Sequence, residues 1–383
     1  MIHLRQLIET RVRAIVEGHD RGRWPLTRAA LTPAAVAYGA LMRLRVRLYE
    51  RGWLKRRRLP CIVIAVGNLT AGGTGKTPMT MFVAEGVRRL GYPVAVISRG
   101  YKGALEHSVA VVSDGRKIQL SPAAAGDEPV MMALRLEGVP VVVGRDRVAT
   151  GMLAIRRFQP RVIVCDDAFQ HLRLVRDMDL VLLDHCHPLG NGWMLPRGML
   201  REPASALGRA DALVLTRCDR PCGTAGMALP QAFTSEKPVF RTRHDPFVCR
   251  VVAGEKGALP GAPVGLDGVG MEWVAGRTVF AFSGIARNRD FRESLQQAGC
   301  TVAGHAEFAD HHAFSEVELS QIFRQAAEVE AEVMVTTEKD YVRIAHHETW
   351  PLDLVVIGIR MVFMEKGAGF EKYLRERLSA LTG

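Results

Sequence analysis

A glycine-rich loop carries the clearest chemistry in this sequence. The run from Gly72 to Thr77 (GGTGKT) follows an apolar segment, Cys61–Val66, and precedes a helical pattern. Glycines let backbone N–H groups turn toward a phosphate, and the N-terminus of the following helix adds positive potential. The strict form G-x-x-x-x-G-K-[ST] is met except at Thr70, where glycine is usual. We therefore predict a nucleoside triphosphate site formed by Thr70, Ala71, Gly72, Gly73, Thr74, Gly75, Lys76 and Thr77.

The loop needs an acidic metal partner at the end of a neighbouring strand. Asp166 and Asp167 come directly after the apolar run Val162–Cys165. Paired carboxylates beside Mg²⁺-ATP neutralise charge and fix geometry, with the Thr77 hydroxyl as a further ligand. The alternative is a strand-end cap. Gln170 and His171 follow and could reach the same site.

Other candidates are weaker when each is taken alone. Asp127 and Glu128 precede a proline, a pattern that also simply starts helices. His311 follows an acid and could act as a general base or orient one, although surface histidines are common. Arg147 and Arg201 could clamp phosphate, or could be solvated surface residues.

One segment favours a different nucleotide. Thr216-Arg217-Cys218-Asp219 is similar to the N/T-K-x-D motif with which GTPases read guanine, but an arginine stands where lysine is usual. A P-loop GTPase or ATPase acting at a membrane surface is therefore the alternative function.

The elements that must position these residues alternate between strand and helix. Apolar runs separated by helical stretches predict an α/β fold of the P-loop NTPase type with a mainly parallel sheet. We expect four parts: a basic amphipathic segment over 1–58, a nucleotide-binding domain over 59–244, a Gly/Pro-rich linker or insertion over 245–275, and a smaller α/β domain over 276–383.

The charge of the chain is concentrated at its N-terminus. The net charge is +11, and residues 1–58 hold fourteen Arg or Lys against four Asp or Glu. Residues 29–42 are apolar but too short to span a bilayer, which takes about twenty residues. From Leu41 the pattern becomes amphipathic, and the basic cluster 55–58 follows. This favours a helix in a membrane interface beside anionic headgroups, the alternative being a helix packed on its own domain.

The remaining composition narrows the class of protein. Seven scattered cysteines indicate free, buried thiols in a reducing compartment, and no second Cys/His pair completes a zinc site near Cys218 and Cys222. Aromatic residues make up 7% of the chain and are not interleaved with basic ones, so we expect no nucleic-acid partner.

Several motifs together resemble the lipid A 4′-kinases, the tetraacyldisaccharide 4′-kinase family. They run in the family's order from Val66 to about Ile344: VGNLTAGGTGKTP (66–78), SRGY (98–101), GDEP (126–129), GRDR (144–147), DDAFQHLRL (166–174), LREP (200–203), FSGIA (282–286), FADHH (308–312) and TTEKD (336–340). Thr70 is one of the matching positions.

The resemblance implies that ATP and Mg²⁺ phosphorylate the 4′-hydroxyl of a tetraacyldisaccharide 1-phosphate, giving lipid IVA on the cytoplasmic face of the inner membrane. It implies catalytic roles for Asp127, which activates the hydroxyl, and for His311, its partner. It implies metal roles for Thr77, Glu128, Asp166 and Asp167, and nucleotide or site-ordering roles for Arg147, Gln170, His171 and Arg201. The short N-terminal helix resembles the family's membrane anchor.

The chain departs from the family pattern at a few positions. Ala168 stands where the family usually has glycine, and the segment 194–203 reads MLPRGMLREP where the family is near LLPAGPLREP. Arg197 and Met199 leave the conformation of this loop, and with it headgroup or acyl preference, open. Arg287 and Asn288 stand where a proline usually follows GIA.

Overall fold

The computed structural model describes residues 24–222, 237–255, 268–347, 349–364 and 368–382, together with Val16. The expected N-terminal segment and the expected linker therefore lie partly outside the described residues. The chain divides into two compact units. The first comprises residues 1–99, 146–243 and 361–383, and the second comprises residues 100–145 and 244–360.

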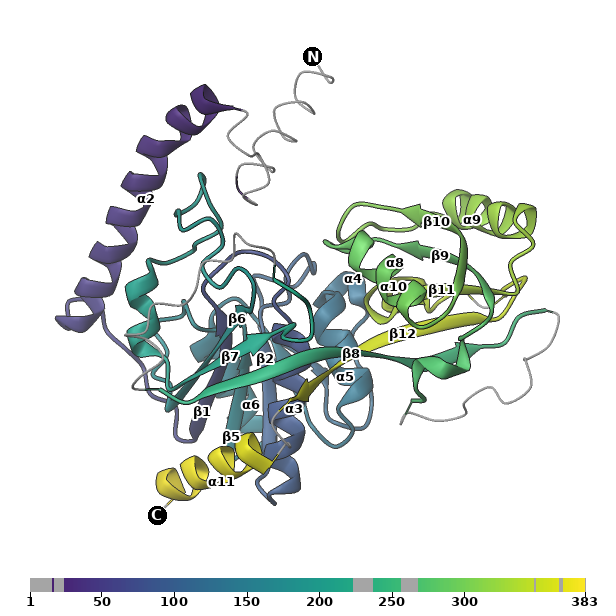
Figure 1. The fold of residues 1–383 in the computed structure, drawn as a ribbon. Coiled ribbons are helices and arrows are strands. Elements are labelled where there is room, and N and C mark those ends of the chain that lie inside the picture. Colours follow the sequence, from purple (N-terminus) through teal and green to yellow (C-terminus); the bar gives the residue numbers. More distant parts are fainter. Residues whose placement is uncertain are drawn as a thin grey trace. The chain divides into compact units, whose positions relative to one another are not determined.

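The first unit contains a parallel sheet whose strands lie in the order β8-β7-β6-β1-β5-β2 (Figure 1). The strands are β1 (Ile62–Asn68), β2 (Val94–Ser98), β5 (Val162–Asp166), β6 (Met178–Asp184), β7 (Ala212–Thr216) and β8 (Val239–Val252), of which only the part of β8 up to Arg243 belongs to this unit. The residues of β1, β2, β5, β6 and β7 are almost all buried, as expected of strands covered on both faces, whereas most residues of β8 are partly or fully exposed. Val66 of β1 pairs with Asp166 of β5, so the two strands end side by side.

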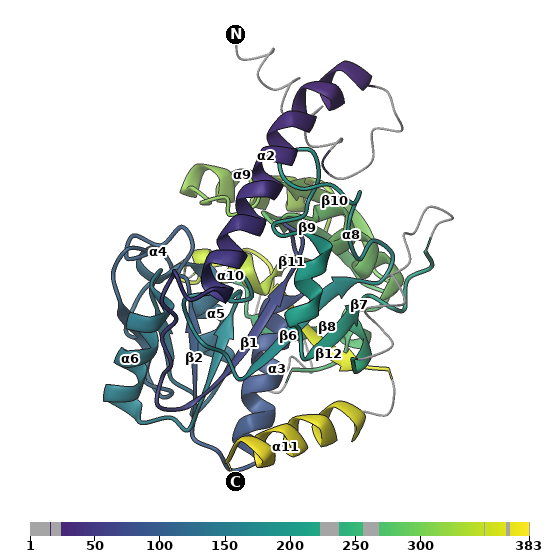
Figure 2. The same ribbon diagram turned by 90° about the vertical axis from the view of Figure 1, so that its left-hand side faces the viewer.

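Helices flank this sheet. They are α2 (Pro25–Glu50), α3 (Lys76–Arg89), α6 (Arg147–Phe158), α11 (Ala368–Thr382) and the short 3₁₀ helix η1 (Ala204–Arg209). Helix α3 directly follows β1 and the glycine loop, and it packs on β1, β2 and β5. Helix α11, at the C-terminal end of the chain, packs against α3 (Figure 2).

The second unit has its own parallel strands in the order β10-β9-β11-β12. They are β9 (Thr278–Ser283), β10 (Thr301–Glu307), β11 (Val333–Thr337) and β12 (Leu354–Phe363), and β3 (Ala110–Ser113) pairs antiparallel with β4 (Val141–Val143). The helices are α4 (Pro122–Ala125), α5 (Asp127–Arg135), α8 (Asn288–Gln297), α9 (Glu316–Glu328), α10 (Glu338–Ile344) and the 3₁₀ helix η2 (Met271–Trp273). Helices α5 and α10 pack against each other.

The predicted fold class, α/β with a mainly parallel sheet, is confirmed. The two units are nevertheless discontinuous along the chain, whereas the sequence suggested contiguous ranges. Residues 100–145 belong with the second unit and residues 361–383 with the first. Strand β8 continues to Val252 and so occupies the start of the expected linker. The sequence does not predict this strand, because polar residues recur along it, whereas the predicted strands are unbroken apolar runs.

Helix α2 is longer than the sequence suggested, since it begins at Pro25, a residue well suited to the first turn. Ala35 and Gly39 are buried, and Tyr38 and Met42 pack on a core cluster that includes Met194 and Leu200. Large apolar side chains on the other side are exposed, among them Leu26, Val36, Leu41 and Leu44. No helix in the described part of the chain is long and apolar enough to cross a membrane.

Candidate functional site

The glycine loop joins β1 to α3 and depends on two left-handed residues. Gly72 has φ +111° and Gly75, the residue before α3, has φ +85°. Residues that carry a Cβ rarely adopt these backbone conformations. Asn68, wholly buried at the end of β1, donates from Nδ2 to the Thr74 hydroxyl at 2.9 Å. The side-chain amide of Asn68 therefore stabilises the conformation of the loop. Lys76 and Thr77 are the first two residues of the helix that follows.

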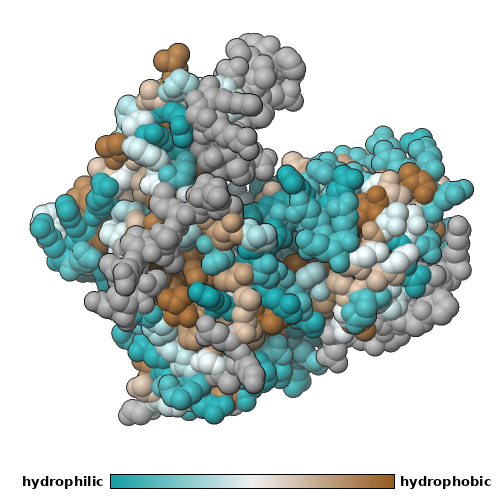
Figure 3. Space-filling view, viewed as in Figure 1, coloured by the Kyte–Doolittle hydropathy of each residue, from teal (hydrophilic) through white to brown (hydrophobic). Residues whose placement is uncertain are grey.

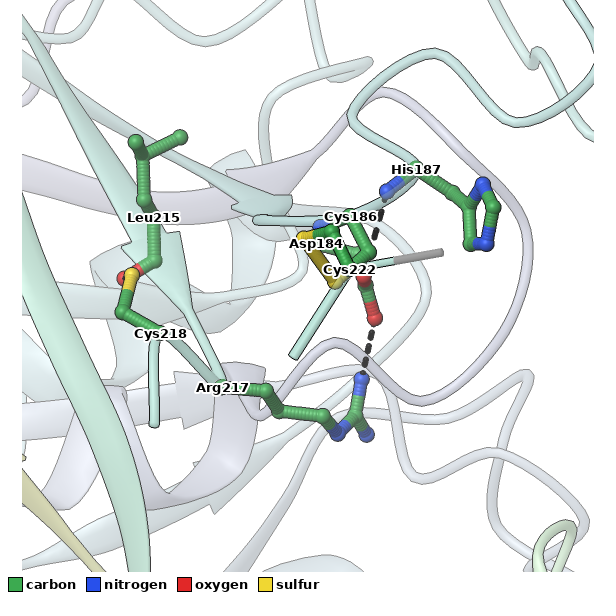
Figure 4. Close-up of a disulfide and its surroundings, with 7 residues drawn as sticks. All are labelled: Asp184, Cys186, His187, Leu215, Arg217, Cys218 and Cys222. Carbon is green, nitrogen blue, oxygen red and sulfur yellow. Dashed lines mark hydrogen bonds and ion pairs between the residues drawn. A yellow bond between two sulfur atoms is a disulfide. The ribbon is translucent and has the colours of Figure 1, made fainter. Parts of the chain in front are cut away.

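Arg217 holds the loop from the end of β7. Its Nη2 donates to the Gly73 carbonyl at 2.6 Å, and its Nη1 donates to Asp184 Oδ2 at 2.7 Å (Figure 4). The guanidinium is thus engaged with the backbone of the phosphate loop. In the segment that is similar to a guanine-reading motif, Arg217 supports the loop and its side chain is nine-tenths buried.

A second segment of the first unit pairs with the start of the loop. The Ala71 N–H donates to the Met199 carbonyl at 2.7 Å, and the Arg201 N–H donates to the Leu69 carbonyl at 2.9 Å. Within this segment, Arg197 stacks 3.4 Å over the Trp193 ring and donates to the Thr32 hydroxyl of α2. The part of the chain that departs most from the family pattern therefore packs against α2.

Asp167, Arg201 and Lys76 form one charged group beside the loop. Arg201 donates to both carboxylate oxygens of Asp167, and Lys76 Nζ lies 4.0 Å from Asp167 Oδ2. Burial opposes ionisation, but Lys76 and Arg201 together hold the pKa of Asp167 well below its ordinary value. Asp167 is therefore a carboxylate at neutral pH, and it is left-handed with φ +48°.

Two buried charged residues, Asp166 and Arg147, lie at the end of β5. Asp166, buried at the end of β5, accepts from the hydroxyls of Thr80 and Ser98 at 3.0 and 3.3 Å. Arg147 is also buried and donates to the Asp166 carbonyl. Ala168 is buried and is not among the left-handed residues, so the methyl group in place of the family's glycine is accommodated.

Gln170 and His171 complete this cluster. Gln170 Nε2 donates to the Asn68 carbonyl at 2.9 Å, which ties the 166–171 segment to the end of β1. Burial and the nearby Arg147 guanidinium lower the pKa of His171 to about 4, so its imidazole is neutral at pH 7. The structure thus brings the site residues predicted in the first unit to one edge of the sheet.

The site residues predicted in the second unit form their own cluster. Asp127 is the first residue of α5, and its Oδ2 lies 2.8 Å from His311 Nδ1. Arg343 of α10 donates to the same oxygen from Nε and Nη2, at 2.9 and 2.7 Å. Burial opposes ionisation, but these donors lower the pKa of Asp127 to about 2. The contact between Asp127 and His311 that the resemblance implies is present, and their catalytic roles remain predictions.

Lys339, also on α10, lies among three of these polar groups. Its Nζ is 3.1 Å from His311 Nε2, 3.1 Å from Asp310 Oδ1 and 3.6 Å from Glu128 Oε1. Within this unit, Glu128 therefore forms an ion pair with a lysine. Among the described residues, no group of three or more His, Cys, Asp and Glu side chains is arranged to hold a metal ion by itself.

Sequence reasoning missed Asn68, Arg217, Lys339 and Arg343. Lys339 stood inside the TTEKD motif, and Arg343 follows it by four residues, the spacing that puts two side chains on one face of a helix. This spacing could have indicated that Lys339 and Arg343 lie on the same face of a helix. The roles of Asn68 and Arg217 depend on contacts to the glycine loop that only the folded chain reveals.

A disulfide joins Cys186 and Cys222, whose positions are 36 residues apart in the sequence (Figure 4). The expectation of free thiols is wrong for this pair, while Cys61, Cys165, Cys218, Cys249 and Cys300 are free. Asp184 accepts from the backbone N–H groups of Cys186 and His187, so the disulfide adjoins the carboxylate that pairs with Arg217.

Comparison with known proteins shows the family to which this chain is similar. A model described as tetraacyldisaccharide-1-P 4′-kinase (LpxK) matches residues 27–379. A tetraacyldisaccharide 4′-kinase of Desulfatibacillum aliphaticivorans is 41% identical over 378 residues, 99% of each chain. One of Pelobacter propionicus is 43% identical and covers 82% of each chain.

A solved structure is similar as well. LpxK from Aquifex aeolicus, described as an "apo" form in complex with ATP, superimposes with a TM-score of 0.73 and 30% sequence identity. The match covers 92% of this chain and 99% of that one.

Proposed function

Since this chain belongs to the tetraacyldisaccharide-1-P 4′-kinase family, we propose that its two clusters act on the two reactants of that transfer. The enzyme is an ATP-dependent kinase of lipid A biosynthesis. The group at the end of β1 binds the nucleotide phosphates, and the group at the start of α5 receives the sugar hydroxyl. The observation that carries the proposal is the ionised, hydrogen-bonded Asp127 beside His311.

The nucleotide is held by the glycine loop. Backbone N–H groups between Gly72 and Gly75 and the N-terminus of α3 supply donors and positive potential for the phosphates. Lys76 is kept beside Asp167 and adds a point charge for the β- and γ-phosphates. Arg201 holds Asp167 with a planar fork, which fixes the carboxylate while the lysine remains available to the phosphates.

The residues beside the loop fit a magnesium ion. Mg²⁺ usually takes one or two carboxylates together with phosphate and water oxygens, and Thr77, Asp166 and Asp167 supply such oxygens near the ends of β1 and β5. We assign the metal to these three residues. Glu128, the further acid that the family pattern suggests, belongs to the second unit. When bound, the ion would neutralise charge on the phosphates.

The hydroxyl is activated by a carboxylate that is already ionised. As the 4′-oxygen attacks the γ-phosphorus, the O–H bond breaks and its proton passes to Asp127. The new O–P bond forms while the bond between the γ-phosphorus and the β,γ-bridging oxygen breaks, and ADP leaves. A carboxylate of low pKa accepts such a proton late in the transfer, when the alcohol has become acidic.

We place the enzyme on the cytoplasmic side of the inner membrane, where α2 is the contact. Leu26 is 84% exposed and Leu44 is 51% exposed, and the basic residues 55–58 follow the helix. Figure 3 shows hydrophobic side chains along the outer edge of α2. An exposed apolar stripe beside a basic cluster suits the interface of an anionic membrane, from which a tetraacylated substrate would be drawn.

The proposal is tested by incubating the purified protein with γ-labelled ATP and tetraacyldisaccharide 1-phosphate. We expect label in a product with a second phosphate, lipid IVA, and a loss of several orders of magnitude for Lys76→Ala. A folded protein that binds ATP but labels no lipid would overturn the proposal. GTP serving as well as ATP would support the alternative P-loop enzyme.

A further inference from the structure

Helix α10 presents two basic side chains to the pair Asp127 and His311. Lys339 and Arg343 are four residues apart, so they lie on one face of the helix. This face packs toward α5, whose first residue is Asp127. Neither basic residue has a role in the reaction as proposed so far.

Asp340 and the His312 carbonyl hold one end of the Arg343 guanidinium, and its other donors contact Asp127 Oδ2. Its Nη1 donates to Asp340 Oδ1 at 2.8 Å and to the His312 carbonyl at 3.2 Å. Asp340 is wholly buried and also accepts from the Gly284 N–H and the Thr337 hydroxyl. The remaining donors of Arg343, Nε and Nη2, both go to Asp127 Oδ2.

The two oxygens of Asp127 are therefore not equivalent. Oδ2 receives three contacts, two from Arg343 and one from His311 Nδ1. No donor among the described residues contacts Oδ1. Since the lone pairs of Oδ2 are occupied, Oδ1 is the oxygen left to accept a proton.

Lys339 fixes the tautomer of His311. An ammonium group has only donors, so His311 Nε2, 3.1 Å from Lys339 Nζ, must be the accepting nitrogen. The ring proton then sits on Nδ1 and is donated to Asp127 Oδ2 at 2.8 Å. Both hydrogen bonds of the ring agree with this one tautomer, and the Asp310 carboxylate lies farther from Nε2, at 3.8 Å.

We propose that Lys339 and Arg343 are positioning residues for the phosphoryl transfer. Lys339 holds His311 as the Nδ1–H tautomer, and Arg343 with His311 occupies Oδ2 of Asp127, which leaves Oδ1 as the acceptor of the hydroxyl proton. This inference rests on the proposed role of Asp127.

The test compares Lys339→Met with the wild type in two independent readouts. The first is the ¹⁵N NMR spectrum of histidine-labelled protein, with the His311 signals assigned from His311→Gln. We expect the Nδ1–H signature in the wild type and a mixture of tautomers in Lys339→Met. The second is kinetics, where kcat should fall by about 10–100-fold with the KM for ATP unchanged.

Arg343 is tested by Arg343→Lys, because removing the guanidinium altogether would leave Asp340 buried without its partner. One ammonium cannot reproduce the fork, so we expect kcat to fall about 10-fold or more while the melting temperature changes little. Lys372→Met, an exposed lysine of α11, is the matched control and should match the wild type.

The outcomes distinguish a failure of the positioning roles of Lys339 and Arg343 from a failure of the proposed role of Asp127. An unchanged tautomer in Lys339→Met, or a kcat within twofold of wild type in both variants, overturns the positioning roles. If the tautomer shifts as expected but Asp127→Asn keeps normal turnover, the proposed function of Asp127 fails and the inference built on it fails too.

Discussion

Arg201 donates one N–H to each oxygen of Asp167, with Nη1–Oδ2 and Nη2–Oδ1 distances of 3.0 and 2.8 Å. The same guanidinium donates to the Asn68 carbonyl at 3.2 Å. One side chain therefore ties the acid after β5 to the strand that enters the glycine loop. These contacts support the proposal that Arg201 stabilises the nucleotide site through Asp167 and Asn68 and does not clamp a phosphate directly.

Replacing Arg201 tests that support. In Arg201→Lys the charge is kept but the two-pronged contact is lost, so Asp167 should shift relative to Lys76. We expect kcat/KM for ATP to fall on the order of 100-fold, the typical effect of misplacing a catalytic group. Arg89→Met, which breaks an exposed ion pair with Glu371, is the control and should stay within twofold. Equal activities in the two variants would contradict the assigned role.

His171 should make stability depend on pH. Its pKa is about 6.5 when unfolded and about 4 when folded, so the unfolded chain binds the extra proton between these values. Stability is therefore fully present above about pH 6.5 and is lost progressively down to about pH 4, by roughly 3 kcal/mol at most.

Urea unfolding of wild type and His171→Asn at a series of pH values measures this difference. The wild-type free energy of unfolding should drop more steeply than that of the variant over this range. His346→Asn, which changes an exposed histidine, should keep the wild-type slope. Parallel curves for wild type and His171→Asn would show that the imidazole is not held neutral.

The disulfide between Cys186 and Cys222 should contribute to stability. Closing a loop of this length restricts the unfolded chain, and such bonds typically contribute about 2–4 kcal/mol. Dithiothreitol should therefore lower the urea midpoint of the wild type. The double variant Cys186→Ser/Cys222→Ser should begin at the lower midpoint and not respond to the reductant. A wild-type midpoint that is insensitive to dithiothreitol would show that the bond is absent in solution.

The exposed face of α2 should determine membrane binding. Leu41 and Leu44 are each about half exposed, so moving them into an apolar interface contributes about 2–3 kcal/mol together. Leu41→Glu/Leu44→Glu removes this contribution and adds two charges that anionic headgroups repel, so partitioning into anionic vesicles should fall at least about 100-fold. Co-sedimentation with vesicles measures this. Val317→Glu, an exposed apolar residue of α9, should bind as the wild type does. Equal sedimentation of both variants would place the membrane contact elsewhere.

The sequence was most informative where short local patterns determine structure. The strand before Gly67 and the strand before Asp166 were predicted because buried parallel strands are unbroken apolar runs. The glycine loop was predicted because its conformation depends on residues that are adjacent in the chain.

What sequence reasoning missed depends on long-range contacts. Arg343 is 216 residues from Asp127, and the Cys186–Cys222 bond closes a separation of 36 residues. No local pattern reports such pairings. The units are also discontinuous, because residues 100–145 pack with a domain whose other residues begin at 244, and only tertiary packing reveals that.

The central claim is that Asp127 accepts the proton of the 4′-hydroxyl. The most direct measurement is the single-turnover rate of Asp127→Asn with saturating ATP and tetraacyldisaccharide 1-phosphate, alongside its ATP affinity. The asparagine keeps the shape of the side chain but cannot take the proton, so the rate should fall by a factor on the order of 10²–10⁴ with ATP affinity retained. A rate within a few-fold of the wild type, with ATP affinity unchanged, would contradict the account.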